Sequence, residues 1–243
     1  MRERCWSAQY SPVRLEGSYI YQRVMLNFRV DAARLGSRLP PGWRPEDRLG
    51  GSNLTVGFCD VLEHVDALER PIPTPAYRYV PFNGNSQGPH GLGANWRYAT
   101  YSDRPEDLGK CLTKLARSSR SFRLTDRDGT VVIEESYEFA GEDGGVMSVH
   151  LEYERGTPRH YASADDGMHV RCPAEPDIEF VYRNEEWRDM VLHREDAIDR
   201  TRSLEYRIAV PGFGDVFDSS EELVSVAAIP WSRRQVFSVE AGP

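Results

Sequence analysis

The sequence predicts a single, mainly β domain, in which an antiparallel sheet closes around a pocket and one or two helices pack against it. Segments that alternate apolar and polar residues recur along most of the chain, as expected for strands with one buried face. Turn-forming residues separate these segments, and no linker or internal repeat divides the chain. A length of 243 residues with 40% hydrophobic residues suffices for one barrel or sandwich with a substantial core.

Residues 19–30 carry the strongest strand pattern. One face of this predicted strand is apolar and comprises Ile20, Val24, Leu26, Phe28 and Val30. Tyr21 lies on the other face. Gln22 interrupts the apolar face, where it is either a hydrogen-bonded core amide or a pocket residue. Asp31 then suits the N-cap of a short helix, which the Pro-Pro-Gly sequence at 40–42 ends.

Further strands are predicted over 53–62 and 94–101, with a long irregular segment between them. Residues 69–93 are rich in proline, glycine and asparagine. Irregular segments of this length in compact domains often serve as lids or binding loops. This segment therefore supplies candidate substrate-binding side chains, namely Asn83, Asn85, Gln87 and His90.

Residues 105–118 are predicted to form a helix. A proline followed by two acidic residues suits a first turn, and apolar residues then recur with helical spacing. The two lysines of the chain, Lys110 and Lys114, lie off this apolar stripe on a side expected to face solvent. Every other basic residue is an arginine. Such a bias is typical of GC-rich bacterial genomes.

The Asp-Gly pair at 128–129 predicts a hairpin over 121–139, and a third strand follows over 146–154. Glu135 falls on the apolar face of this hairpin's second strand. A carboxylate in that position is either a general acid or base, or half of a buried ion pair with an arginine such as Arg97 or Arg207.

The rest of the chain continues the same pattern. Strands are predicted over 177–183, 203–210 and 223–230, and a short helix is predicted within 185–199. Barrels with a covered outer wall bury both faces of their strands. The pattern therefore does not decide which face of each strand lines the pocket.

Composition excludes several classes of protein. The net charge of −8, with arginines scattered among acidic residues, argues against nucleic-acid binding and against anionic membranes. No apolar run approaches the roughly 20 residues that span a bilayer, and no signal peptide is evident. The cysteines, Cys5, Cys59, Cys111 and Cys172, are far apart, so free thiols in a reducing cytoplasm are expected.

Common cofactor and nucleophile motifs are absent. The six histidines show neither HxxxH nor HExxH spacing and do not group with cysteines, so no metal site is expected. No glycine-rich loop follows a strand as a nucleotide site requires, and the GxSxG motif does not occur. The sequence therefore predicts no metal or organic cofactor.

Four segments, taken in order, resemble the acetoacetate decarboxylase superfamily. They are FRVDAARLGSRLPPGWRP, YVPFNGN, YSDRPEDLGKCLTKLA and the stretch from DVFDSSEELVSVAAIP to RRQVF. The resemblance implies a cone-like β-barrel with an apolar pocket, in an enzyme that assembles into a homo-oligomer. In the decarboxylases of this family a lysine forms a Schiff base with a β-keto acid, and an arginine and two glutamates assist.

This sequence departs from most of that set of residues. Aligned without gaps, the family's lysine motif falls at residues 117–119, where there is no amine, and only a gap brings Lys114 into register. The family's arginine falls on Tyr21. One family glutamate falls near residues 55–57, where there is no acid, and the other falls close to Pro73, where only a loop shift would bring Glu69 into place. A decarboxylase with the family's usual chemistry is therefore not expected.

The favoured hypothesis is an enzyme of bacterial specialised metabolism that performs lyase-type acid–base chemistry beside a carbonyl without a Schiff base. The reaction would be a dehydration, an aldol or retro-aldol step, or cyclisation of a polyketide-like substrate. Glu135 is the candidate acid or base and Tyr21 the candidate enolate-stabilising group. The candidate substrate-binding residues are Arg97, Asn95, Asn83, Gln87 and His90. For each, an ordinary structural role is the alternative.

Two other functions stay open at this stage. In the first, Lys114 forms the imine and the protein decarboxylates a β-keto acid. In the second, the protein carries an apolar metabolite without turning it over. Reduction with borohydride in the presence of a carbonyl compound separates the first from the favoured hypothesis. The second predicts that replacing Glu135 by glutamine leaves binding unchanged.

Overall fold

The structure is a computed structural model that describes residues 13–47, 50–73, 75–89, 93–104, 113–163, 168–173 and 175–239. Strands dominate these residues, and one short helix, α1 (Ala32–Gly36), accompanies them. The predicted mainly β fold is confirmed. No helix within these ranges is long and apolar enough to cross a membrane.

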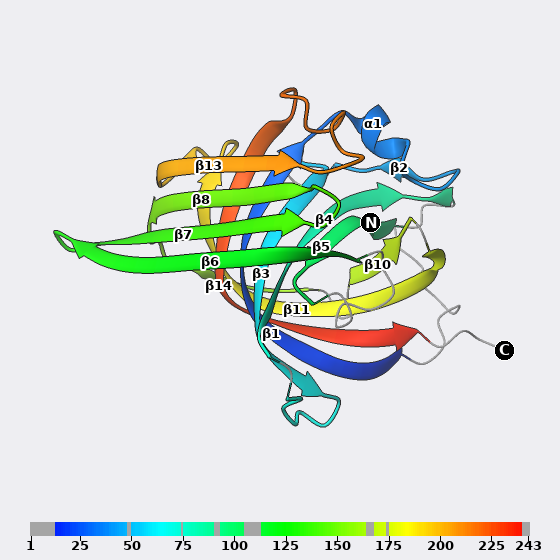
Figure 1. Cartoon of the computed structure of the whole chain (residues 1–243), viewed down its shortest axis with the longest axis horizontal. Helices are drawn as coiled ribbons and strands as arrows, with labels where there is room; N and C mark the ends of the chain where they lie inside the picture. The colour runs from blue at the N-terminus through cyan, green and yellow to red at the C-terminus, as the bar shows by residue number, and fades with distance from the viewer. Residues whose placement is uncertain are drawn as a thin grey trace, which may run out of the picture.

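Seven strands form a closed barrel (Figure 1). Their hydrogen-bonded order returns to its starting point, because the last strand pairs with the first. In ring order they are β5 (Gly93–Ser102), β10 (Met168–Cys172), β11 (Glu175–His193), β14 (Glu222–Val239), β1 (Val13–Arg29), β3 (Leu54–Asp66) and β4 (Tyr77–Gln87). All neighbours in the ring are antiparallel except β5 and β10.

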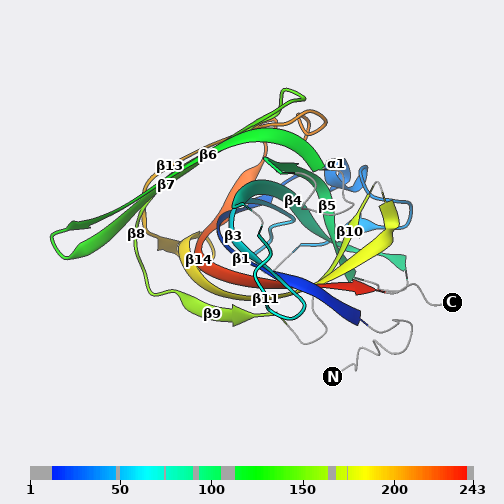
Figure 2. The ribbon, with the colours of Figure 1, turned by 60° about the horizontal axis from the view of Figure 1, so that its bottom comes forward.

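A second antiparallel sheet covers part of the barrel's outer wall. It contains β6 (Thr113–Arg127), β7 (Thr130–Gly141), β8 (Val146–Glu154) and β13 (Thr201–Ala209). A short parallel pairing between β5 and β6 joins it to the barrel. In Figures 1 and 2 the β6–β7 hairpin projects away from the body of the protein. The remaining short strands are β2 (Arg44–Pro45), β9 (Arg159–Ala162) and β12 (Ile198–Asp199).

The main hydrophobic core lies between the barrel wall and this covering sheet. Val24, Leu26 and Phe28 of β1 belong to the same buried cluster as Tyr137 and Phe139 of β7. Successive side chains of a strand point to opposite faces. The alternate residues of β1, including Tyr21, therefore point into the barrel, where Tyr21 packs in a separate buried cluster.

Two local predictions are confirmed in detail. Asp31 caps α1, since its Oδ1 accepts hydrogen bonds from the backbone N–H groups of Ala33 and Arg34 at 2.8 and 3.1 Å. The β6–β7 turn has positive φ at both central residues, 55° at Asp128 and 81° at Gly129. This conformation matches the right-handed twist of the strands and suits an Asp-Gly pair.

Three secondary-structure predictions are wrong. The helix predicted over 105–118 fails from Thr113 onward, where β6 begins; residues 105–112, including Lys110, lie outside the described residues. The helix predicted within 185–199 fails because β11 continues to His193 between β9 and β14. In both places pairing with neighbouring strands outweighs a weak local helical pattern.

The third wrong prediction is the long loop over 69–93, because β4 occupies 77–87. Its glycine and asparagine residues suggested irregular backbone. Gly84 has another role there, since an added Cβ would lie 2.8 Å from the backbone oxygen of Asn53. Glycine therefore does not always indicate a turn. Inside a strand it can mark the close approach of another backbone segment, as it does here.

Candidate functional site

The barrel encloses a buried polar cluster. We call it the interior cluster; it comprises Tyr21, Arg23, Cys59, Tyr79, Arg97, Tyr182, Asn184, Glu186 and Arg234, each at most 9% exposed. Contacts across the ring show that these side chains lie inside. Arg234 of β14 donates to the hydroxyl of Tyr79 of β4 at 3.3 Å, and Arg97 of β5 stands 5.8 Å from the ring of Tyr182 of β11. Neither pair of strands is adjacent in the barrel.

A break in strand register directs Arg97 inward. Phe82 pairs with Ala99, but the next residue of β4, Asn83, pairs with Arg97, which leaves Tyr98 as an extra residue on β5. Such a bulge reverses the side-chain alternation beyond it. Arg97 therefore shares a face with Asn83, and its Nε lies 3.4 Å from the Oδ1 of Asn83.

Within the interior cluster, the guanidinium groups of Arg23, Arg97 and Arg234 outnumber the single carboxylate, Glu186. Glu186 is completely buried, forms ion pairs with Arg23 and Arg188, and accepts a 3.4 Å hydrogen bond from Ser232. Burial alone would raise the pKa of Glu186, but Arg23 and Arg188 outweigh it and hold that pKa below its usual value. Glu186 is shared with Arg188, so the described members of the cluster include more cations than carboxylates.

Tyr21 lies close to two of these cations. The guanidinium carbons of Arg23 and Arg234 stand 5.3 and 5.2 Å from the centre of its ring. The Tyr21 hydroxyl and the Nε of Arg23 are both buried without a hydrogen-bond partner among the described residues. Each such group costs about 1–3 kcal/mol of stability. A ligand that accepts hydrogen bonds from both would recover that energy.

The neighbouring Cys59 and Tyr79 retain their protons. Burial raises the pKa of the Cys59 thiol, and burial also raises the pKa of Tyr79 well above its ordinary value. The interior cluster thus combines fixed cations with neutral proton donors. Such an arrangement can bind an anion and can stabilise negative charge on a carbonyl oxygen.

Comparisons with solved structures agree with this architecture. The enduracididine biosynthesis enzyme MppR complexed with pyruvate superposes with a TM-score of 0.60 at 11% identity, covering 98% of this chain and 91% of that chain. An acetoacetate decarboxylase-like enzyme from Sphingomonas wittichii RW1 gives a TM-score of 0.56 at 12% identity, covering 96% and 93%. The chain has the acetoacetate decarboxylase-like fold. No protein-family model and no curated protein sequence matches it.

This fold brings several predicted site residues together. Tyr21 and Arg97 belong to the interior cluster, and Asn83 contacts Arg97. Asn95, also on β5, is buried and donates to the Oδ1 of Asn85 at 2.9 Å. Gln87 lies at the end of β4, where its Oε1 accepts a 2.5 Å hydrogen bond from Arg44. His90 lies outside the described residues.

Glu135 and Lys114 stand apart from the interior cluster. Glu135 of β7 faces the outer wall of the barrel and pairs with Arg120, rather than with Arg97 or Arg207, at 2.7 Å. Lys114 lies at the start of β6, where its 40% exposed side chain pairs with Asp143 at 2.7 Å. The structure therefore separates Glu135 from Tyr21, and the catalytic roles predicted for Glu135 and Lys114 stay predictions.

Of the interior cluster, sequence reasoning identified only Tyr21 and Arg97. It missed the other seven members, which include the charged residues Arg23, Glu186 and Arg234. Arg23 could have been found, since it shares the non-core face of its strand with Tyr21. Arg234 lies in the RRQVF segment beyond the strand predicted at 223–230, and β14 extends through it. Glu186 was hidden by the wrongly predicted helix, because a helix does not place residues two apart, such as Asn184 and Glu186, on one face, whereas a strand does.

Proposed function

We propose that this protein is an enzyme that binds a small carboxylate-bearing carbonyl compound inside the barrel and stabilises its enolate without forming a Schiff base. The reaction is lyase-type and breaks or forms a bond beside the carbonyl, as in an aldol or retro-aldol step or a dehydration. One observation carries this proposal. The Tyr21 hydroxyl and Arg23 Nε are buried without a hydrogen-bond partner among the described residues, in a cluster whose described members include more cations than carboxylates.

The cations are suited to anchoring the substrate's carboxylate. Arg234 is already oriented, since its Nε donates to Asn184 at 2.8 Å and its Nη1 donates to Tyr79 at 3.3 Å. Arg97 approaches the same region from β5, beside the ring of Tyr182. Guanidinium groups held in place by packing and hydrogen bonds bind carboxylates with defined geometry and little loss of side-chain entropy.

Tyr21 and Arg23 are suited to donate hydrogen bonds to the carbonyl oxygen of the substrate. When the bond beside a carbonyl breaks, its electron pair moves to this oxygen, and donors already aimed at it lower the barrier. The Tyr21 hydroxyl and Arg23 Nε supply two such donors, and Glu186 holds the guanidinium of Arg23 in place. Cys59 and Tyr79 keep protons that can return to the enolate carbon.

The structural neighbours make this class of substrate chemically reasonable. MppR has been solved with pyruvate, and also with the condensation product of pyruvate and imidazole 4-carboxaldehyde. Pyruvate combines a carboxylate with an adjacent carbonyl, and its condensation with an aldehyde proceeds through an enolate equivalent. We extend this chemistry to the present chain as part of the proposal.

The proposal is tested by enolate formation, which needs no knowledge of the full substrate. Protein in deuterium oxide is mixed with pyruvate or acetoacetate, and exchange of the hydrogens beside the carbonyl is followed by proton NMR. We expect exchange with the acids to exceed exchange with their methyl esters. Equal exchange with acid and ester would contradict carboxylate anchoring, and no exchange above the buffer rate would contradict the proposal as a whole.

Lys114 provides a separate prediction. Its ammonium pairs with Asp143 and contacts the hydroxyl of Tyr101 at 3.3 Å, outside the interior cluster. A Schiff-base lysine must reach the carbonyl carbon of the substrate, and Lys114 lies outside the cluster proposed to hold that carbonyl. We therefore expect borohydride with pyruvate or acetoacetate to leave the intact mass unchanged, with Lys114→Arg as the reference. A reduced adduct mapped to Lys114 would restore the Schiff-base decarboxylase hypothesis.

A further inference from the structure

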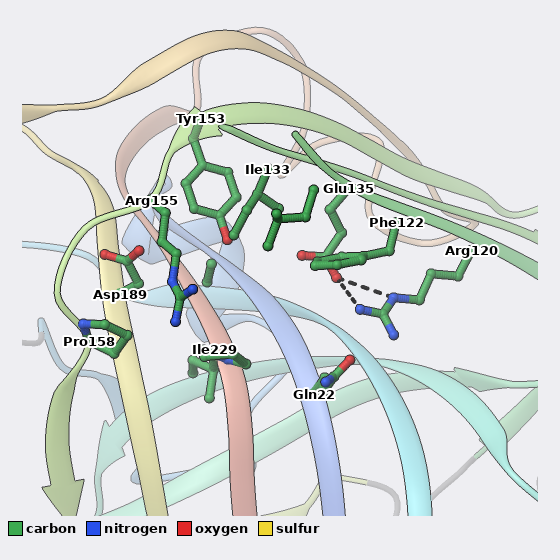
Figure 3. A pocket seen from close by; sticks show the side chains of 13 residues that line it. Gln22, Arg120, Phe122, Ile133, Glu135, Tyr153, Arg155, Pro158, Asp189 and Ile229 are labelled. Carbon is green, nitrogen blue, oxygen red and sulfur yellow. Dashed lines mark hydrogen bonds and ion pairs between the residues drawn. The ribbon is translucent and has the colours of Figure 1, made fainter. Parts of the chain in front are cut away.

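A second polar site lies outside the barrel, between its outer wall and the covering sheet. We call it the Glu135 pocket; it has a volume of about 210 Å³, and its lining includes Gln22, Phe122, Ile133, Glu135, Tyr153 and Arg155. Figure 3 shows Tyr153 of β8, and Arg155 just after this strand, directed towards Gln22 and Ile229 on the barrel wall. Gln22 and Tyr21 are adjacent residues of β1, so their side chains point to opposite faces of the barrel wall. This pocket is therefore distinct from the interior cluster.

Glu135 presents one open carboxylate oxygen to this pocket. All of its hydrogen bonds end on Oε1, which accepts from Arg120 Nε at 3.2 Å, Arg120 Nη2 at 2.7 Å and the Tyr137 hydroxyl at 2.9 Å. Oε2 accepts no hydrogen bond from a described residue. The carboxylate is thus fixed in position while half of its acceptor capacity is unused. Arg120 also pairs with Asp60 at 2.6 Å, and Asp60 pairs in addition with Arg78 at 3.1 Å.

Arg155 supplies an unneutralised cation on another side of the pocket. Figure 3 shows its guanidinium directed into the pocket beside Asp189. Asp189 is already engaged, because it pairs with Arg200 and its Oδ2 accepts a 2.8 Å hydrogen bond from the backbone of Gly156. Arg155 itself forms no ion pair with any residue in the described part of the chain.

Two neutral polar groups also line this pocket. The hydroxyl of Tyr153 and the amide of Gln22 line the pocket and have no hydrogen-bond partner within the described ranges. Burial, with the charges of Glu135 and Asp189, raises the pKa of Tyr153, so its hydroxyl keeps its proton and can donate. The pocket therefore holds an open acceptor, an open cation and two further polar groups.

Apolar side chains complete the walls. Phe122 and Leu124 of β6 line the pocket although they are 53% and 52% exposed, and Ile133 and Ile229 lie deeper. At about 30 Å³ per water in the liquid, the volume corresponds to about seven waters, which limits the ligand to a small molecule. A pocket that is apolar with a few convergent polar groups is typical of small-molecule sites.

We propose that the Glu135 pocket binds a small zwitterion, namely an amino acid with a short apolar side chain. Its ammonium group donates to Glu135 Oε2, its carboxylate pairs with Arg155, and its side chain packs against Phe122 and Ile133. Tyr153 and Gln22 supply further hydrogen bonds. This site is separate from the interior cluster, and the inference does not rest on the function proposed for that cluster.

Isothermal titration calorimetry with the full chain tests this inference. The probes are leucine and two compounds with the same branched body, isoamylamine and 4-methylpentanoate, which each lack one charge. We expect saturable binding of leucine, with at least tenfold weaker binding of either single-charge compound. Equal affinity for all three, or no heat from leucine up to tens of millimolar, would overturn the inference.

Two variants test which residue binds each charged group of the ligand. Arg155→Gln replaces an exposed side chain that has no ion pair with another described residue. We expect it to weaken leucine binding at least tenfold and to leave isoamylamine binding unchanged. Glu135→Gln is expected to weaken leucine and isoamylamine but not 4-methylpentanoate. Arg117→Gln, an exposed arginine outside this pocket, is the matched control. Leucine binding that is unchanged in Arg155→Gln would overturn the inference even if Glu135→Gln fails to fold.

Discussion

Tyr21→Phe is expected to lower the rate of enolate formation about a hundred- to a thousand-fold, the effect of removing one preorganised donor to an oxyanion. The substitution keeps the ring that lies close to Arg23 and Arg234 and removes only the hydroxyl. Hydrogen exchange beside the carbonyl of pyruvate or acetoacetate, followed by NMR in deuterium oxide, measures the effect.

The same variant is expected to be at least as stable as the parent protein. The Tyr21 hydroxyl is buried without a partner in the described structure, so its removal abolishes a desolvation penalty of about 1–3 kcal/mol and breaks no hydrogen bond. Urea unfolding should show an unchanged or higher free energy. Lower activity with higher stability is the pattern of a group kept for function.

Tyr161→Phe is the matched control, because Tyr161 is 44% exposed on β9 and outside both polar sites. It should change neither exchange nor stability measurably. If Tyr21→Phe exchanges hydrogen as fast as the parent protein, the chemistry does not depend on the interior cluster. Glu135 and Lys114 would then be the residues to substitute next.

Several strands of the barrel, and the position of Tyr21 in the candidate site, were predictable from sequence because both depend on alternation. Tyr21 was assigned to the face opposite Val24, Leu26 and Phe28, and that assignment holds along β1. The Asp-Gly turn and the Asp31 cap were predictable because each depends on residues close in the chain.

The rest of the interior cluster depends on pairing between distant segments. Arg97 points inward because of a bulge, and nothing in the sequence around it specifies which strand acquires the extra residue. The segment around Gly84 was predicted as a loop because glycine and asparagine are common in turns. Glycine is also required where two backbone segments pack closely, and this is its role at Gly84. The helix around Glu186 was predicted from local spacing of residues. In the structure this segment is a strand, because it pairs with β14.

Glu135 and Tyr21 illustrate a further limit. Sequence reasoning combined them in one site because both appeared as unusual residues on regular strands. The structure places them on opposite sides of the barrel wall. Glu135 faces the outer surface of the wall, and Tyr21 points into the interior of the barrel. Strand patterns indicate which face a residue occupies, but closure of the sheet decides which faces meet.

Glu186→Gln is expected to be the most destabilising of these substitutions. Its carboxylate is completely buried between Arg23 and Arg188, and removal of one partner from a buried ion pair costs about 3–5 kcal/mol. An amide keeps the shape but leaves both guanidinium groups without their counter-charge. Urea unfolding monitored by tryptophan fluorescence measures the loss.

The pH dependence of that loss follows from the direction of the pKa shift. The pKa of Glu186 is lower in the folded protein than in the unfolded chain, so its stabilising effect is complete above the unfolded value. The effect is lost as pH falls through the folded value. The difference between parent and Glu186→Gln should therefore be large at neutral pH and shrink in acid.

Glu185→Gln separates this effect from a general loss of negative charge. Glu185 is the neighbouring residue on β11, 53% exposed, and its described ion-pair partner is His160. Exposed pairs contribute about 0–1 kcal/mol, so this control should unfold almost as the parent does. If both variants lose equal stability, Glu186 does not act as a buried counter-ion. The role proposed for Glu186, which is to hold the Arg23 guanidinium in place for the carbonyl oxygen, would then be wrong.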